Sequence, residues 1–194
     1  MNFNWLHQNL YGYLSLKKNY YFKTKPFLTN QSSTPLEYFL MDRFVQHHPL
    51  LQDPKNWTIN KTQKEAQFKH TDKIPDLEAE YALFKTKKLT DQIDYLLTDE
   101  YGYLLPELSS GEWVLKEVEL KHLIIPNEKY SKSLAKEIID DYIIQLEQGR
   151  ELIGGLFLPR GEYFRLIDGY HRLSALKQKF GGDHLVSILT FEHN

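Results

Sequence analysis

The sequence predicts an α+β protein, with a mainly helical region over residues 1–111 and a second region, over residues 112–194, in which strands and helices alternate. Two observations support this division. Apolar residues recur at helical spacing in the first region, whereas in the second they gather in short runs rich in β-branched side chains. The second region follows the order β-α-β-β-α-β with short links, which is typical of a compact unit whose helices cover a sheet.

Helix signals dominate the first region. Thr34-Pro-Leu-Glu37 has the form of a capping box with a proline at the first helical position, and Pro49 is expected to end that helix. A second helix is predicted from near Pro75, and Thr90 is expected to cap a third. Residues 52–72 are polar and show no periodicity, so a loop is predicted there.

The second region carries the strand signals. In chain order, the expected elements are one strand through residues 114–125, a helix over residues 131–148 closed by Gly149, strands over residues 156–158 and 163–167, a helix over residues 171–179, and a strand over residues 185–191.

Charge and composition exclude several classes of protein. The formal charge is −2, from 24 basic and 26 acidic side chains, which disfavours a general nucleic-acid binder because such proteins neutralise many phosphates. The absence of cysteine excludes disulfides and thiolate nucleophiles. No apolar stretch approaches the roughly 18 residues of a membrane span, and the first residues do not resemble a secretory signal. A cytoplasmic protein with no membrane partner is therefore expected.

A candidate anion site lies where a predicted strand runs through Asp168-Gly169 directly into a predicted helix. Glycine allows a tight turn and a close approach of a ligand, and the first turn of a helix favours negative charge. Arg172 adds a forked donor suited to phosphate oxygens, and His171 adds a second donor when it is protonated.

The segment Leu166-Ile-Asp-Gly-Tyr-His-Arg-Leu-Ser-Ala-Leu-Lys177 resembles the D-G-x-H-R-x-x-A signature of the ParB/sulfiredoxin superfamily. The resemblance extends over residues 118–191, through the order of strands and helices. It implies a nucleotide, ATP or CTP, bound with Mg²⁺. The residues that it places at the nucleotide are Asp168, Gly169, Tyr170, His171 and Arg172.

Within this superfamily the motif is most similar to that of the free serine kinases. Sulfiredoxin chemistry needs a cysteine where Tyr170 stands, and partition proteins carry a glutamate and two arginines in this box. The kinase resemblance makes Glu128, in Ile125-Pro-Asn-Glu128, the candidate general base or the carboxylate that orients the acceptor. It also makes Asp168, which would help to hold magnesium or to position the nucleophile, and His171 candidate catalytic residues.

The resulting hypothesis is an ATP-dependent phosphotransferase or nucleotide hydrolase that acts on an unidentified small molecule or protein. One alternative is a nucleotide-dependent regulator whose helical region binds a protein or DNA. Another is a ParB-like nuclease or effector, which the charge disfavours.

Simpler structural interpretations also stand beside the functional ones. Asp168-Gly169 could be an ordinary turn, Tyr170 could pack beneath it, and Arg172 could be a surface residue paired with Glu162 or Asp168. Adjacent histidines on a helix diverge, so His47-His48 is interpreted as a helix end, and no dedicated metal site is predicted apart from the magnesium that accompanies the nucleotide.

Overall fold

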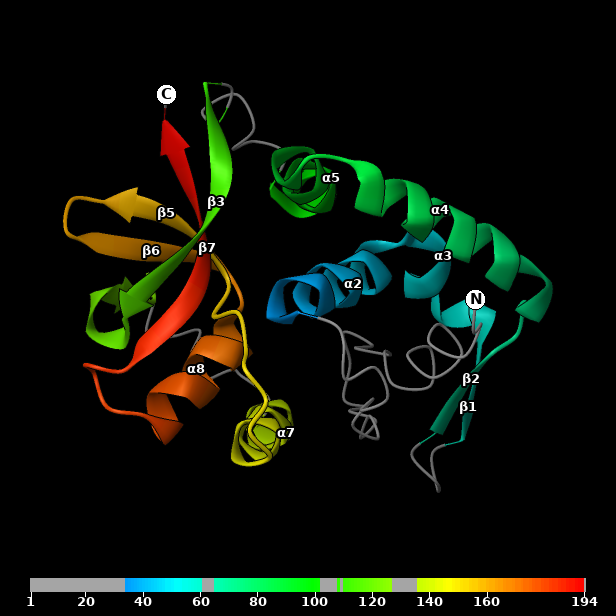
Figure 1. Ribbon diagram of the computed structural model, residues 1–194. Helices are drawn as coiled ribbons and strands as arrows, with labels where there is room; N and C mark the ends of the chain where they lie inside the picture. Colours follow the sequence, from blue (N-terminus) through cyan, green and yellow to red (C-terminus); the bar gives the residue numbers. More distant parts are fainter. Residues whose placement is uncertain (1–33, 61–64, 102–107, 109, 127–135, 194) are drawn as a thin grey trace. The chain divides into compact units, whose positions relative to one another are not determined.

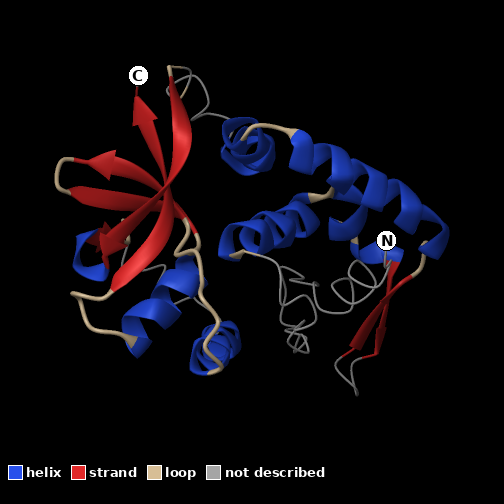
Figure 2. Cartoon of the chain, viewed as in Figure 1, coloured by secondary structure: helices blue, strands red, loops and turns tan. Residues whose placement is uncertain are grey.

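The computed structural model describes residues 34–60, 65–101, 108, 110–126 and 136–193 (Figure 1). The chain divides into two compact units, Met1–Asp99 and Glu100–Asn194. Helices predominate among the described residues of the first unit, and the second unit is built on a mixed five-stranded sheet (Figure 2). The α+β class is therefore confirmed.

The first helix of the first unit begins as its sequence predicts. Helix α2 spans Pro35–His47, and Thr34 forms a reciprocal capping box with Glu37. The Glu37 amide donates to Thr34 Oγ1 at 3.2 Å, and the Thr34 amide donates to Glu37 Oε2 at 2.9 Å. The chain leaves the helix at His48, and a four-residue helix, α3, follows over Pro49–Gln52. The proline therefore starts a new turn as well as ending the old one.

Two longer helices follow in the described part of the first unit. Helix α4 spans Ile74–Thr86 and α5 spans Leu89–Tyr101. Both helices were predicted, but Thr90 lies inside α5 and does not precede it. The helices bury a shared aromatic and aliphatic core of Phe44, Leu77, Tyr81, Phe84, Ile93, Leu96 and Leu97.

The loop predicted over residues 52–72 is wrong. Strands β1, Trp57–Asn60, and β2, Glu65–Phe68, pair antiparallel, with single 3-10 turns before and after them at Pro54–Asn56 and Thr71–Lys73. Trp57 anchors the hairpin, because its ring is buried and its indole N–H donates to the Leu51 carbonyl at 2.8 Å. Both strands do alternate, with Trp57 and Ile59 in β1 and Ala66 and Phe68 in β2, but a run of four residues among polar neighbours is too short to be recognised as a strand from the sequence.

The sheet of the second unit has the order β3-β7-β5-β6-β4. Strands β3 and β7 pair antiparallel, as do β5 and β6, whereas β7 pairs parallel with β5 and β4 pairs parallel with β6. Their bounds are Gly111–Glu119 for β3, Leu123–Ile124 for β4, Leu156–Arg160 for β5, Tyr163–Asp168 for β6 and Leu185–His193 for β7.

The single strand predicted through residues 114–125 is in fact two strands at opposite edges of this sheet. A 3-10 turn, Leu120–His122, separates β3 from β4. Leu120 and Leu123 are both buried, so the turn belongs to the core although it breaks the strand. Apolar content alone does not reveal such a break, because the buried turn is as apolar as the strands that it joins.

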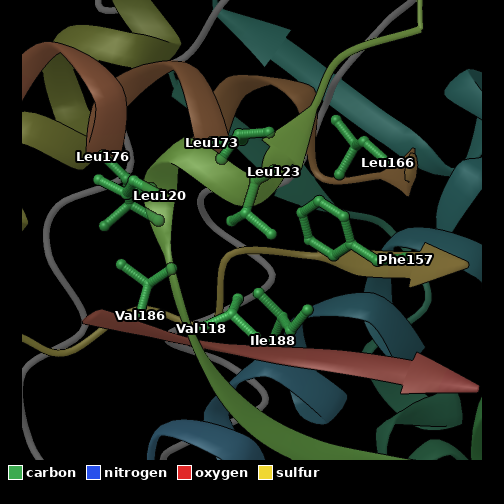
Figure 3. Close-up of a cluster of buried hydrophobic side chains, with 9 residues drawn as sticks. All are labelled: Val118, Leu120, Leu123, Phe157, Leu166, Leu173, Leu176, Val186 and Ile188. Carbon is green, nitrogen blue, oxygen red and sulfur yellow. The ribbon is translucent and has the colours of Figure 1, made fainter. Parts of the chain in front are cut away.

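Two helices accompany the sheet, and one of them, α8 (Tyr170–Lys179), contributes buried side chains to its hydrophobic core. Helix α7, Lys136–Glu147, is followed by Gly149 with a φ of +79°, so the glycine closes the helix as predicted. The helix lies beside α8. Leu173 and Leu176 of α8 pack on apolar side chains from the sheet (Figure 3). The remaining members of this core are Val118, Leu120, Leu123, Phe157, Leu166, Val186 and Ile188.

We expect Leu173→Ala to lower the free energy of unfolding by about 2–5 kcal/mol, because it leaves a cavity under α8. Urea denaturation followed by circular dichroism measures the change. Leu185→Ala is the matched control, since Leu185 is 56% exposed. A loss for Leu173→Ala no larger than that of the control would contradict the role of this contact.

Candidate functional site

The turn between β6 and α8 has the backbone conformation that its sequence requires. Asp168 is the last residue of β6, and Gly169 is the N-cap of α8, with a φ of +110° and a ψ of 26°. This left-handed conformation favours glycine. Gly169 has no side chain with which to cap the helix, and the Leu173 amide donates to the Gly169 carbonyl at 2.9 Å. The N-cap residue therefore contributes only main-chain atoms to the start of α8.

The topology of the sheet places this turn where two neighbouring strands end. Because β4 and β6 are parallel, their carboxyl ends lie on the same side of the sheet, and the antiparallel strand β5 begins there. In open parallel α/β sheets, ligands bind outside the carboxyl ends of the strands. The turn occupies the corresponding position after β6 in this mixed sheet.

Two glycines that the sequence analysis did not single out pack directly on the turn. Gly155 has a φ of +143°, and a Cβ atom on it would lie 2.2 Å from the Asp168 carbonyl oxygen. A Cβ atom on Gly169 would lie 2.8 Å from the Gly154 carbonyl oxygen and 2.8 Å from the Gly155 Cα. The main chain of the two glycines therefore lies directly against the main chain of the turn. Two adjacent glycines immediately before a strand indicate a close approach of backbone, and this is the feature of the sequence from which the contact could have been predicted.

Arg172 lies inside the turn and is only 5% exposed, so its interpretation as a surface residue is wrong. Its Nη2 atom is 3.8 Å from Asp168 Oδ2, which makes the two residues an ion pair one helical turn apart. The same Nη2 would lie 3.5 Å from a Cβ on Gly169, so the guanidinium folds back over the turn. Removing one partner of such a pair leaves a poorly solvated charge behind.

His171 is partly buried, and its environment disfavours the charged form. Burial lowers the pKa of His171 below its ordinary value, the neighbouring Arg172 guanidinium lowers it further, and the Asp168 carboxylate acts in the opposite direction. At neutral pH the imidazole is therefore neutral and offers one N–H donor.

Tyr170 is the first residue of α8, and its ring packs against the hydrophobic core. This contact supports the interpretation of Tyr170 as a structural residue beneath the turn, one of the two alternatives that the sequence left open. The five motif residues thus form one local arrangement in which Asp168, His171 and Arg172 interact electrostatically.

The other candidates from the sequence lie elsewhere. Glu128 is outside the residues that the structure describes. His47 contacts Arg43, whereas His48 Nε2 contacts Glu80 Oε2 at 2.8 Å, so the two histidines serve different partners in the first unit. Within the described ranges, no group of three or more histidine, aspartate or glutamate side chains is arranged to hold a metal ion.

Neither a protein-family model nor a curated protein matches the chain. Of the helices that the structure describes, none is long and apolar enough to cross a membrane.

The depressed pKa of His171 predicts a specific dependence of stability on pH. Below the ordinary histidine pKa of 6.5 the unfolded chain takes up the proton first, so the free energy of unfolding falls as the pH decreases through this range. His171→Gln should lack this component in urea denaturation between neutral pH and about pH 5. The imidazole protons of His171, followed by NMR, should titrate below 6.5, and a midpoint at or above that value contradicts the prediction.

Proposed function

We propose that this chain is a nucleotide-binding protein of the ParB/sulfiredoxin type, and that the turn from Asp168 to Arg172 binds the phosphates. The observation that carries the proposal is the junction itself, in which a strand passes through a left-handed glycine, a residue without a capping side chain, into a ten-residue helix. The first amides of an α-helix lie beyond the reach of intrahelical acceptors and point outward, and the helix dipole adds positive potential there.

Arg172 contributes to this site through its charge. An uncompensated Asp168 carboxylate would repel a phosphate, and the Arg172 guanidinium at 3.8 Å balances it. The helix start can then retain its attraction for anions. His171 supplies a neutral N–H donor, and a phosphate bound beside it would raise its pKa and so favour the charged form.

Mg²⁺ belongs to this proposal as the counter-ion of the nucleotide. Magnesium keeps several waters and is commonly held by substrate phosphates with one or two carboxylates. A single carboxylate beside the phosphates, that of Asp168, is compatible with this mode. ATP or CTP would provide the remaining oxygen ligands, and the metal would neutralise charge on the phosphate oxygens.

The reaction class that fits these parts is phosphoryl transfer or nucleotide hydrolysis, with a small molecule, a protein or water as the acceptor. Positioning and charge stabilisation account for most of the catalysis in such reactions. Asp168 would help to hold the magnesium ion or to position the nucleophile, and His171 would donate to the phosphates. Glu128 would accept the proton of the attacking hydroxyl. The role of Glu128 rests on the family resemblance alone.

A nucleotide-dependent regulator is the second candidate. It is favoured by the division of the chain into two compact units, because the first unit is then available to bind a protein or DNA while the second binds the nucleotide. Release of ADP in the presence of ATP separates the enzyme from the regulator.

We expect Arg172→Ala to abolish binding of ATP–Mg²⁺ in calorimetric titrations, because Asp168 then faces the phosphates with its charge uncompensated. CTP–Mg²⁺ titrated in the same way identifies the preferred base. Arg165→Ala removes the same charge from an exposed position of β6 and should bind like the wild type. Circular dichroism confirms that each variant is folded, and unchanged affinity in folded Arg172→Ala rejects the assignment of the turn.

Glu128→Gln should retain the affinity for ATP–Mg²⁺ and lose at least about a hundredfold in the rate of ADP release, within the usual contribution of a general base. Glu151→Gln, an exposed carboxylate in the same unit, is the charge-matched control. Full turnover in Glu128→Gln would remove Glu128 from the mechanism and leave the binding proposal intact.

A further inference from the structure

The Gly154–Gly155 segment lies between strand β7 of the sheet and the turn from Asp168 to Arg172, which is called the phosphate turn below. The Gly154 amide donates to the Ser187 carbonyl at 2.8 Å, and the Leu189 amide donates to the Gly155 carbonyl at 3.0 Å. Both partners belong to β7, so the two glycines are bonded to one strand on both sides of the peptide that links them.

The opposite side of the same segment supports the turn. The Gly155 Cα faces the Asp168 carbonyl so closely that an added Cβ would lie 2.2 Å from that oxygen. Real Cβ atoms do not approach a main-chain oxygen at this distance, and backbone on both sides cannot yield as a flexible side chain would. The Asp168 carbonyl can thus lie this close to the segment only because Gly155 has no side chain.

We propose that Gly155 is a positioning residue of the phosphate turn, which transmits the location of β7 to Asp168 and to the first turn of α8 through main-chain contact. This inference rests on the proposed function, since the quantity that it controls is the affinity of the turn for phosphate. Misplacement of binding groups by about 1 Å is sufficient for large losses in function.

The chain contains a matched control for this role. Gly161 also has a positive φ, of +63°, but a Cβ on it would meet nothing within 4 Å. It lies between β5 and β6, the two strands that lead to and from the site. Gly161→Ala therefore introduces backbone strain in the same hairpin without pressing on the turn.

The first experiment titrates ATP–Mg²⁺ into the full-length wild type, Gly155→Ala and Gly161→Ala, with circular dichroism recorded for each. We expect Gly155→Ala to bind at least about tenfold more weakly and Gly161→Ala to stay within about twofold of the wild type. Equal affinities for the two folded variants overturn the role of Gly155. Failure of the wild type itself to bind ATP or CTP overturns the proposed function instead.

A second measurement needs only the wild-type protein, in case Gly155→Ala does not fold. Saturating ATP–Mg²⁺ should slow amide hydrogen exchange of Leu189 and Gly154, which bond across the segment, together with Leu173 at the turn. The Phe180 amide, bonded to the Leu176 carbonyl at the far end of α8, is the internal control. Slower exchange at Leu173 without any change at Leu189 and Gly154 shows that the turn is not coupled to β7 and overturns the inference.

Discussion

The packing of α8 on the sheet is the interaction on which the second unit depends. Leu173 and Leu176 are buried among side chains from strands β3 to β7, and this contact fixes both the position and the direction of the helix. A helix held in this way has its start, not its end, beside the carboxyl end of β6. The same hydrophobic contact that stabilises the unit therefore aims the positive end of a helix dipole at the edge of the sheet.

The hydrophobic core sets the position of α8 approximately, and backbone contacts then define the position of the turn before it more closely. Side chains in a core relax when a neighbour changes, so they locate a helix less strictly than contacts between main-chain atoms do. At Gly155 and Gly169 no side chain intervenes, and the geometry is limited by peptide groups. The Asp168–Arg172 ion pair affects the charge of the turn, whereas the backbone contacts determine its shape.

Much of this arrangement could be predicted from the sequence because it is local. The capping box at Thr34, the glycine that closes α7, and the junction at Asp168-Gly169 each depend on a few adjacent residues with known conformational preferences. What the sequence did not reveal depends on partners far along the chain. The separation of β3 from β4 and the contact of Gly155 with Asp168 depend on such partners, and hydrophobic periodicity carries no signal for them. The burial of Arg172 was missed for the same reason, since its environment comes from the folded turn. The strands of the β1–β2 hairpin do alternate, but they are too short for the alternation to be recognised.

The position of β7 has a consequence for how the second unit is made in a cell. Strand β7 follows the other four strands of its sheet in sequence, yet it lies inside the sheet, between β3 and β5. Until β7 has left the ribosome, β3 has no neighbour and β5 is paired on one side alone, so two rows of backbone groups stand open to other chains. The nascent unit cannot assemble stepwise from its first strand, and its centre closes only when its final segment inserts. Strands that are far apart in sequence pair slowly, so the unit is most exposed to misassembly in the stage before β7 inserts.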